Sequence, residues 1–132
     1  MELLTQIEVS FLLISENDDD IDVITNTLNI VPSKIRKKGS YKIQKFAHAT
    51  WELSSGRQNC KVVSWQFNKV MSMLLDKEDI ISTIMNDYNL KACFVVSIHA
   101  ENGDGPEVTL KKEIIKFVGK IDATIDFDLY YY

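Results

Sequence analysis

Three aspartates near the start of the chain have the alternating spacing of calcium ligands. The stretch SENDDDIDV places Asp18, Asp20 and Asp22 at every second position. A calcium loop of the EF-hand type also requires a glycine at its sixth position and a bidentate glutamate at its twelfth. Counted from Asp18, those positions hold Val23 and Asn29. The stretch therefore lacks two elements of a calcium site, and we predict no metal there.

The same acids suit the first turn of a helix. Ile21, Ile24 and Leu28 follow them at helical spacing. A short polar side chain at the start of a helix accepts a hydrogen bond from a free backbone N–H, and further acids complement the helix dipole. We predict that Asp19 or Asp20 caps this helix.

Residues for nucleophilic or phosphate chemistry are sparse. The two histidines are His48 and His99, no GxSxG motif is present, and neither Cys60 nor Cys93 belongs to a CxxC motif. The GDGP stretch lacks the lysine and the following helix of a phosphate-binding loop. We therefore predict no catalytic residue, no cofactor and no metal, and we expect the two cysteines to be reduced.

Charge is unevenly distributed along the chain. The net charge is -4, but no acid lies between Asp22 and Glu52, and that interval contains six basic residues: Lys34, Arg36, Lys37, Lys38, Lys42 and Lys45. The basic segment 34–45 can steer a charged partner, or it can be a solvated loop. An acidic chain is a poor default ligand for nucleic acid, so we do not expect one as partner.

Hydrophobic periodicity predicts the main elements. Alternation indicates strands at residues 6–14, 90–98 and 124–132, and one long or two short strands in YKIQKFAHATWEL, while residues 34–40 read as a loop. Helical stripes occupy residues 63–74, 81–88 and 110–121. Asp79 is the expected N-cap of the second stripe.

These elements predict an α+β fold. Residues 6–54 and 90–132 each read as strand, acidic loop, helix and strand, which makes two β-α-β units. We predict a mainly antiparallel sheet with helices on one face, in ferredoxin-like order, with residues 63–88 as a helical insertion between the units. The chain of 132 residues is expected to form one domain, residues 1–132.

Strand alternation also predicts a surface. If the apolar residues of the strands point into the core, acidic and aromatic residues point to the opposite face of the sheet, together with the C-terminal tyrosines 130–132. The candidate binding residues are Trp51, Glu52, His99, Asp126, Asp128 and Tyr130. Trp51 is included although a tryptophan in such a strand is more often part of the core.

The order of features resembles the small bacterial family known as domain of unknown function 4279 (DUF4279). The matching features are VSFLLIS, the helix that closes in LNIVPS, the basic loop with Gly39, ATWELSSG around Trp51, and the ending KEIIKFVGKIDATIDFDLYYY. The most specific of them are the helix-proline element, the tryptophan strand and the closing Asp-x-Asp-x-Tyr of Asp126, Asp128 and Tyr130. The resemblance implies a cytosolic bacterial domain and implies no reaction.

Two functional hypotheses follow from the sequence. The first is a non-enzymatic interaction module that binds a protein through its acidic sheet face or its basic segment, for example an immunity protein that neutralises a basic toxin. The alternative is an enzyme that binds a small molecule or a metal around Glu52, His99, Asp126 and Asp128. No apolar run approaches the roughly 18 residues of a membrane span, and MELLTQIEV lacks the features of a signal peptide, so we expect a cytoplasmic protein without membrane contact.

Overall fold

The structure is a computed structural model that describes residues 5–40, 42, 48–101 and 105–131. Its strands are β1 (Gln6–Ser15), β2 (Lys34–Arg36), β3 (Ala49–Ser54), β4 (Gln58–Asn59), β5 (Lys91–Ala100) and β6 (Ala123–Tyr131). Its α-helices are α1 (Asp18–Leu28), α2 (Val63–Leu74), α3 (Glu78–Asp87) and α4 (Lys112–Lys120), and its short 3-10 turns are η1 (Lys38–Ser40) and η3 (Leu75–Lys77).

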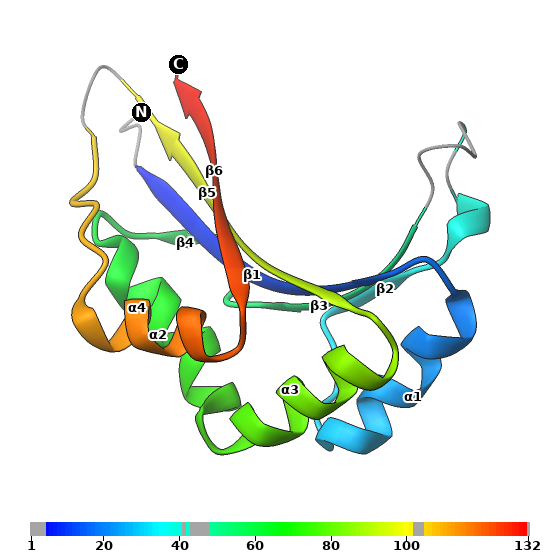
Figure 1. Ribbon diagram of the computed structural model, residues 1–132. Helices are drawn as coiled ribbons and strands as arrows, with labels where there is room; N and C mark the ends of the chain where they lie inside the picture. Colours follow the sequence, from blue (N-terminus) through cyan, green and yellow to red (C-terminus); the bar gives the residue numbers. More distant parts are fainter. Residues whose placement is uncertain (1–4, 41, 43–47, 102–104, 132) are drawn as a thin grey trace.

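The strands form one mainly antiparallel sheet in the order β2-β3-β1-β5-β6. Strand β1 runs antiparallel to β3 and β5, whereas β5 and β6 run parallel, and the short β4 pairs with the first residues of β1. All four α-helices lie against the same face of the sheet (Figure 1). The predicted α+β class, with helices on one face, is confirmed.

The strand order shows where the connections of this ferredoxin-like arrangement run. Strands β1 and β2 flank β3, which is antiparallel to both, so β1-α1-β2 is a β-α-β unit split by one strand. In the same way, α2 and α3 connect β3 to β5. These two strands lie on either side of β1 and are antiparallel to it. Helix α4 and strand β6 then add a parallel β-α-β unit at the edge.

The core lies between the sheet and the helices, and Phe94 is at its centre. Its ring contacts those of Phe11 on β1, Phe67 on α2 and Phe117 on α4, with centroid distances of 5.0, 4.7 and 6.3 Å. Each such aromatic pair adds about 0.5–1.5 kcal/mol beyond the burial of its area. Phe94 thus joins the middle of the sheet to α2 and α4.

Trp51 belongs to this core. Its side chain is fully buried on the helix side of β3, and its indole Nε1 donates a hydrogen bond of 3.1 Å to Thr25 Oγ1 on α1. A buried indole N–H needs such a partner, because an unpaired one would lose its hydrogen bond to water. The interpretation of Trp51 as a core residue is therefore right, and the bond fixes α1 against β3.

Helix α1 begins with a cap different from the predicted one. Asn17 is the N-cap, and its side-chain oxygen accepts a hydrogen bond of 3.0 Å from the backbone N–H of Asp19. The prediction of Asp19 or Asp20 as the cap is wrong, because both residues are already helical. They lie in the first turn, where their negative charges complement the positive end of the helix dipole.

Lys37 and Lys38 of the basic segment contact these acids. Lys37 forms an ion pair with Asp22, and the backbone N–H of Lys38 donates a hydrogen bond of 2.9 Å to Asp18 Oδ1. Residues 34–40 were predicted as a loop, but Lys34–Arg36 form β2, which pairs with β3, and Lys38–Ser40 form η1. Lys45 and most of YKIQKF lie outside the described residues.

Helices α2 and α3 are separated by the turn η3. Helix α3 begins at Glu78 with Lys77 as its N-cap residue, so the expected cap, Asp79, is already inside the helix. Burial follows the predicted stripes: Phe67, Val70 and Leu74 are buried on α2, and Ile81 and Ile84 on α3. Within the described part of the chain, no helix combines the length and the apolar character needed to cross a membrane.

Candidate functional site

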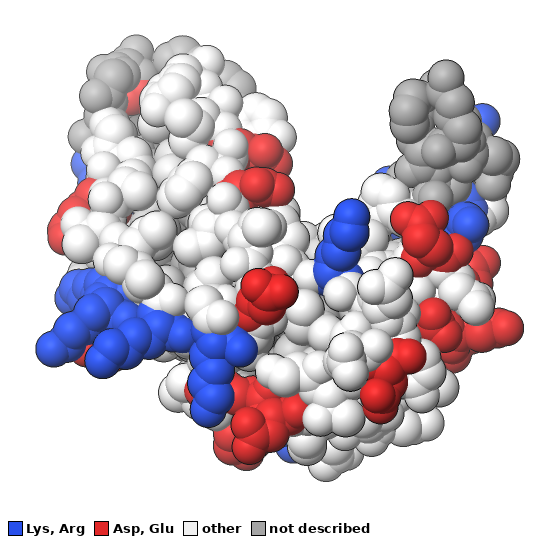
Figure 2. All heavy atoms as spheres, viewed as in Figure 1, with Lys and Arg blue, Asp and Glu red and all other residues white. Residues whose placement is uncertain are grey.

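The side of the sheet opposite the helices, which we call the open face, is hollowed. In Figure 1 the sheet bends upward on both sides of its centre, away from the helices. Figure 2 shows the resulting hollow between the ends of β5 and β6 on one side and β2 on the other. Acidic atoms lie along β6 at the wall of this hollow. In the part of the chain that the structure describes, all four α-helices lie on the other side of the sheet and none covers this face.

Strand register assigns the residues of the open face. On β1, the residues Ile7, Val9, Phe11 and Leu13 are buried in the core, so the alternate positions point to the open face. Cross-strand pairing extends the open face to β3, β5 and β6. It carries four carboxylates, which we call the open-face acids: Glu8, Glu52, Asp126 and Asp128.

The outer end of the face contains a stacked pair of rings. His99 and Tyr130 are partners in the register of β5 and β6, and their rings lie 4.5 Å apart with an angle of 7° between the planes. Gln6 pairs with His99 on the other side, and its Oε1 accepts a hydrogen bond of 2.6 Å from Arg57 Nε. Partial burial and the positive charge of Arg57 lower the pKa of His99, against the opposing effect of Glu8.

The inner part of the face contains the two glutamates. Ser54 Oγ donates a hydrogen bond to Glu8 Oε2, and Glu52 lies beside Lys34 in the register of β3 and β2. Burial and the negative charge of Glu8 raise the pKa of Glu52, and the attraction of Lys34 opposes this rise without cancelling it. Glu52 thus holds a proton more firmly than an ordinary glutamate, which is a property of some general acids.

Cys93 lies on β5 opposite Leu12, at the same level of the sheet as Glu52 on β3. Its thiol is buried and donates a hydrogen bond of 3.3 Å to Asp126 Oδ2. Burial raises the pKa of the Cys93 thiol, so the neutral form predominates and the residue is a poor nucleophile. Beside it is a surface pocket of about 290 Å³, bordered by Lys91, Asp122 and Thr124 among others.

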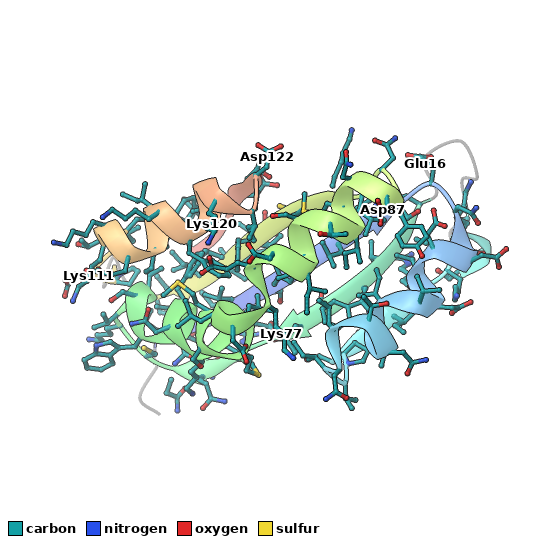
Figure 3. The ribbon with its side chains drawn as sticks, turned by 60° about the horizontal axis from the view of Figure 1, so that its bottom comes forward. Glu16, Lys77, Asp87, Lys111, Lys120 and Asp122 are labelled. Atoms are coloured by element: carbon teal, nitrogen blue, oxygen red, sulfur yellow. The ribbon has the colours of Figure 1, made fainter. Side chains whose placement is uncertain are left out.

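A second charged surface lies on the helical side. Lys112, Lys116 and Lys120 recur every four residues on α4 and share one exposed face of the helix. Basic atoms gather there in Figure 2, and Figure 3 shows Lys111 and Lys120 at the two ends of α4. Lys120 forms an ion pair of 2.6 Å with Glu78 at the start of α3, which ties α4 to α3.

The structure brings together only some of the candidate residues. His99, Asp126, Asp128 and Tyr130 lie on the neighbouring strands β5 and β6. Glu52 lies on β3, two strands away from β5, or about 10 Å at the usual strand spacing. Trp51 is on the opposite side of the sheet and does not belong to the open face.

Several residues of these surfaces were not identified or were misplaced from the sequence. Arg57 follows a turn in which Gly56 adopts a left-handed backbone (φ 78°), and nothing in the local pattern indicates that its side chain reaches Gln6. Tyr131 was placed with Tyr130, but it pairs with Ala100 and points to the helix side. The α4 stripe could have been recognised from the four-residue spacing of its lysines.

Metal-binding geometry is absent from the described residues. Across residues 5–40, 42, 48–101 and 105–131, no three side chains of His, Cys, Asp or Glu are grouped closely enough to hold an ion. Cys60 and Cys93 are both free thiols. The open face can bind charged or hydrogen-bonding groups through its carboxylates, hydroxyls and rings. Its β6 side offers a partner negative charge, and the same register places Lys91 on β5 and Lys34 and Arg36 on β2 on this face as well.

Comparison with known proteins identifies the family of the chain. The family model described as "Domain of unknown function (DUF4279)" matches residues 5–132. Neither the curated proteins nor the solved structures gave a match.

Proposed function

The chain belongs to the DUF4279 family, and we propose that it is a non-enzymatic interaction module whose open face binds a basic protein partner. The observation that carries this proposal is the position of the open-face acids. Asp126 and Asp128 are exposed, and neither forms an ion pair with a described residue. Exposed carboxylates at the wall of a hollow attract and orient a positively charged surface.

The basic segment is a weaker candidate for the interaction surface. Lys37 and Lys38 are engaged with Asp22, Asp18 and the backbone of Glu16. Their charge is therefore partly compensated within the molecule, whereas that of the acids on β6 is not. This difference favours the open face as the functional surface.

One concrete form of this proposal is a bacterial immunity protein in the cytoplasm that neutralises a basic toxin. Such a toxin would place lysine or arginine side chains in the hollow, opposite the open-face acids. A basic toxin encoded by a neighbouring gene would be the first partner to examine. Binding would be measured by calorimetry with the purified full chain.

The test is affinity capture from extracts of the native host with matched charge variants. The double variant Asp126→Asn/Asp128→Asn removes two charges from the open face and keeps the shape of the side chains. The control Asp76→Asn/Asp87→Asn removes two exposed charges from the helical side. We expect the first variant to lose a basic protein that the wild type and the control retain. Equal capture by all three proteins would show that the open face is not the binding surface.

A second candidate function, a small-molecule enzyme, rests on Glu52. Its raised pKa, next to the charge of Glu8, resembles the arrangement in which one carboxyl acts as acid and the other as base. A screen of metabolites by thermal unfolding would test this function, because a ligand of the folded state raises the melting temperature. A ligand whose effect disappears in Glu52→Gln, but not in Glu113→Gln on α4, would support an enzyme at this position.

A further inference from the structure

Strand β6 is exposed on both of its faces. Its helix-side residues Phe127, Leu129 and Tyr131 retain 39, 51 and 65% of their accessible surface. The paired residues on β5, including Val96 and Ile98, are buried. The difference arises because α4 lies along the first part of β6, while the second part extends beyond the helical layer (Figure 1).

The outer edge of β6 is also open. Among the described strands, β6 pairs only with β5, so its other edge presents a row of backbone groups without strand partners. Natural edge strands are usually short or carry lysine, proline or a bulge. The opposite edge of the sheet follows this rule, because β2 has three residues, two of which are Lys34 and Arg36. Strand β6 has nine residues and contains neither lysine nor proline; its charged side chains are Asp126 and Asp128, which point to the open face.

The two faces of β6 have different chemistry. Asp126, Asp128 and Tyr130 point to the open face, while Phe127, Leu129 and Tyr131 point to the helix side. A strand added to this edge would continue both rows, so its alternate side chains would lie beside carboxylates on one face and beside apolar groups on the other. The added strand that complements both rows has basic residues alternating with apolar ones.

We propose that the free edge of β6 binds an extended segment of the partner, in which lysine or arginine alternates with apolar residues. This inference rests on the proposed function and gives it a binding mode, namely strand addition. Backbone hydrogen bonds to β6 would supply affinity, and the alternating side chains would supply specificity.

A second copy of the chain is a poorer occupant of this edge. Two β6 strands related by a two-fold axis would join their open faces into one surface. Asp126 and Asp128 of both copies would then lie on neighbouring strands, where like charges destabilise the pairing. A basic partner strand removes this repulsion.

The test uses peptides as probes and leaves the protein unchanged. The first probe is a labelled nine-residue peptide in which lysine alternates with valine, and the second has the same composition with its lysines in one block. Fluorescence anisotropy with the full chain is expected to show at least tenfold tighter binding of the alternating peptide. Equal binding of the two peptides, or no binding of either, would overturn the proposal.

N-methylated peptides distinguish strand addition from contact between side chains alone. Methylating every second amide of the alternating peptide blocks hydrogen bonding along one of its edges. Two such peptides, one for each edge, should differ at least tenfold in affinity, because only one edge faces β6. If both bind as well as the parent peptide, strand addition is wrong, while the acidic open face can still be the binding surface.

Protein variants give an independent readout. Phe127→Ala/Leu129→Ala should weaken binding of the alternating peptide at least tenfold, and Val108→Ala/Ile115→Ala, which removes exposed apolar groups elsewhere, should leave it unchanged. Sedimentation analysis of the wild-type chain completes the test. A dimer that the β6 variant abolishes would assign the edge to a second copy and overturn the proposal.

Discussion

The imidazole ring of His99 stacks on the phenol ring of Tyr130, with centroids 4.5 Å apart and an angle of 7° between their planes. The stack follows from parallel pairing of β5 and β6, which places the two residues side by side on the open face. It lies beside Asp128, Gln6 and Arg57, so the titration of His99 reports on the outer end of the proposed binding surface.

The pKa of His99 should respond in opposite directions to two neighbouring charges. Burial and Arg57 lower this pKa, and Glu8 raises it. Arg57→Gln is therefore expected to raise the pKa of His99, and Glu8→Gln to lower it further. An NMR titration of the His99 ring protons measures both changes, with Lys116→Gln on α4 as a control that leaves the pKa unchanged. A pKa that moves in the same direction in both variants would contradict this assignment of the charges.

The stability of the protein should depend on pH through the same residue. Because the folded state binds the His99 proton less readily than the unfolded chain, protonation favours unfolding. The contribution of His99 to the unfolding free energy is complete above the ordinary pKa of about 6.5. It is lost as the pH falls from that value through the lowered pKa of the folded state. Denaturant titrations at pH 7.5 and pH 5.5 should show a smaller loss of unfolding free energy for His99→Gln than for the wild type.

Replacement of Glu52 by glutamine should stabilise the protein at neutral pH. The raised pKa means that the folded state disfavours the ionised carboxylate, a penalty that is complete above the folded-state pKa and absent below the ordinary value of 4.5. We expect Glu52→Gln to have a higher unfolding free energy than the wild type at pH 7.5. The gain should vanish near pH 4, and Glu113→Gln should show no such dependence. A loss of stability at pH 7.5 would contradict the prediction.

The hydrogen bond between Trp51 and Thr25 should be measurable as an energetic coupling. Trp51→Phe removes the indole donor, and Thr25→Val removes the hydroxyl acceptor. In a double-mutant cycle, the coupling in unfolding free energy is expected to be about 0.5–1.5 kcal/mol. Pairing Trp51→Phe with Asn26→Ala, an exposed change one residue away on α1, should give additive effects.

The N-cap of α1 tests whether the acidic stretch at its start serves as a helix start. Asn17→Ala should lower the unfolding free energy by about 1 kcal/mol, because it leaves the backbone N–H of Asp19 without its acceptor. Asn26→Ala in the middle of α1 serves as the matched control and should have a smaller effect. If addition of calcium raised the melting temperature, the interpretation of this stretch as a helix start alone would be wrong.

Periodicity predicted the elements well and their ends less well. The strand at residues 90–98 and the helices near residues 63–74 and 110–121 were identified because burial forces a regular apolar pattern. The cap of α1 was assigned to the wrong residue, since Asn17, Asp19 and Asp20 all suit that role and only the backbone geometry distinguishes them. Strand β2 was missed because an edge strand with one neighbour carries little apolar signal.

The candidate site was predicted in outline because strand alternation fixes which residues share a face. Asp126, Asp128 and Tyr130 follow from that rule alone. The distance between Glu52 and β6, the contact of Arg57 with Gln6, and the contacts of Lys37 and Lys38 with α1 all depend on strand order and turn geometry. A single sequence does not encode those relationships as a local pattern.

The position of β6 at the end of the element order has a consequence for synthesis on the ribosome. Strands β1 to β5 with α1, α2 and α3 are complete before α4 and β6 emerge, so β5 is the outermost strand of a nascent chain that has already folded to that point. At about 5–20 residues per second, this state lasts on the order of seconds. During that interval the largely apolar strand β5 presents an unpaired edge to other nascent chains, and the arrival of β6 replaces it with an acidic one.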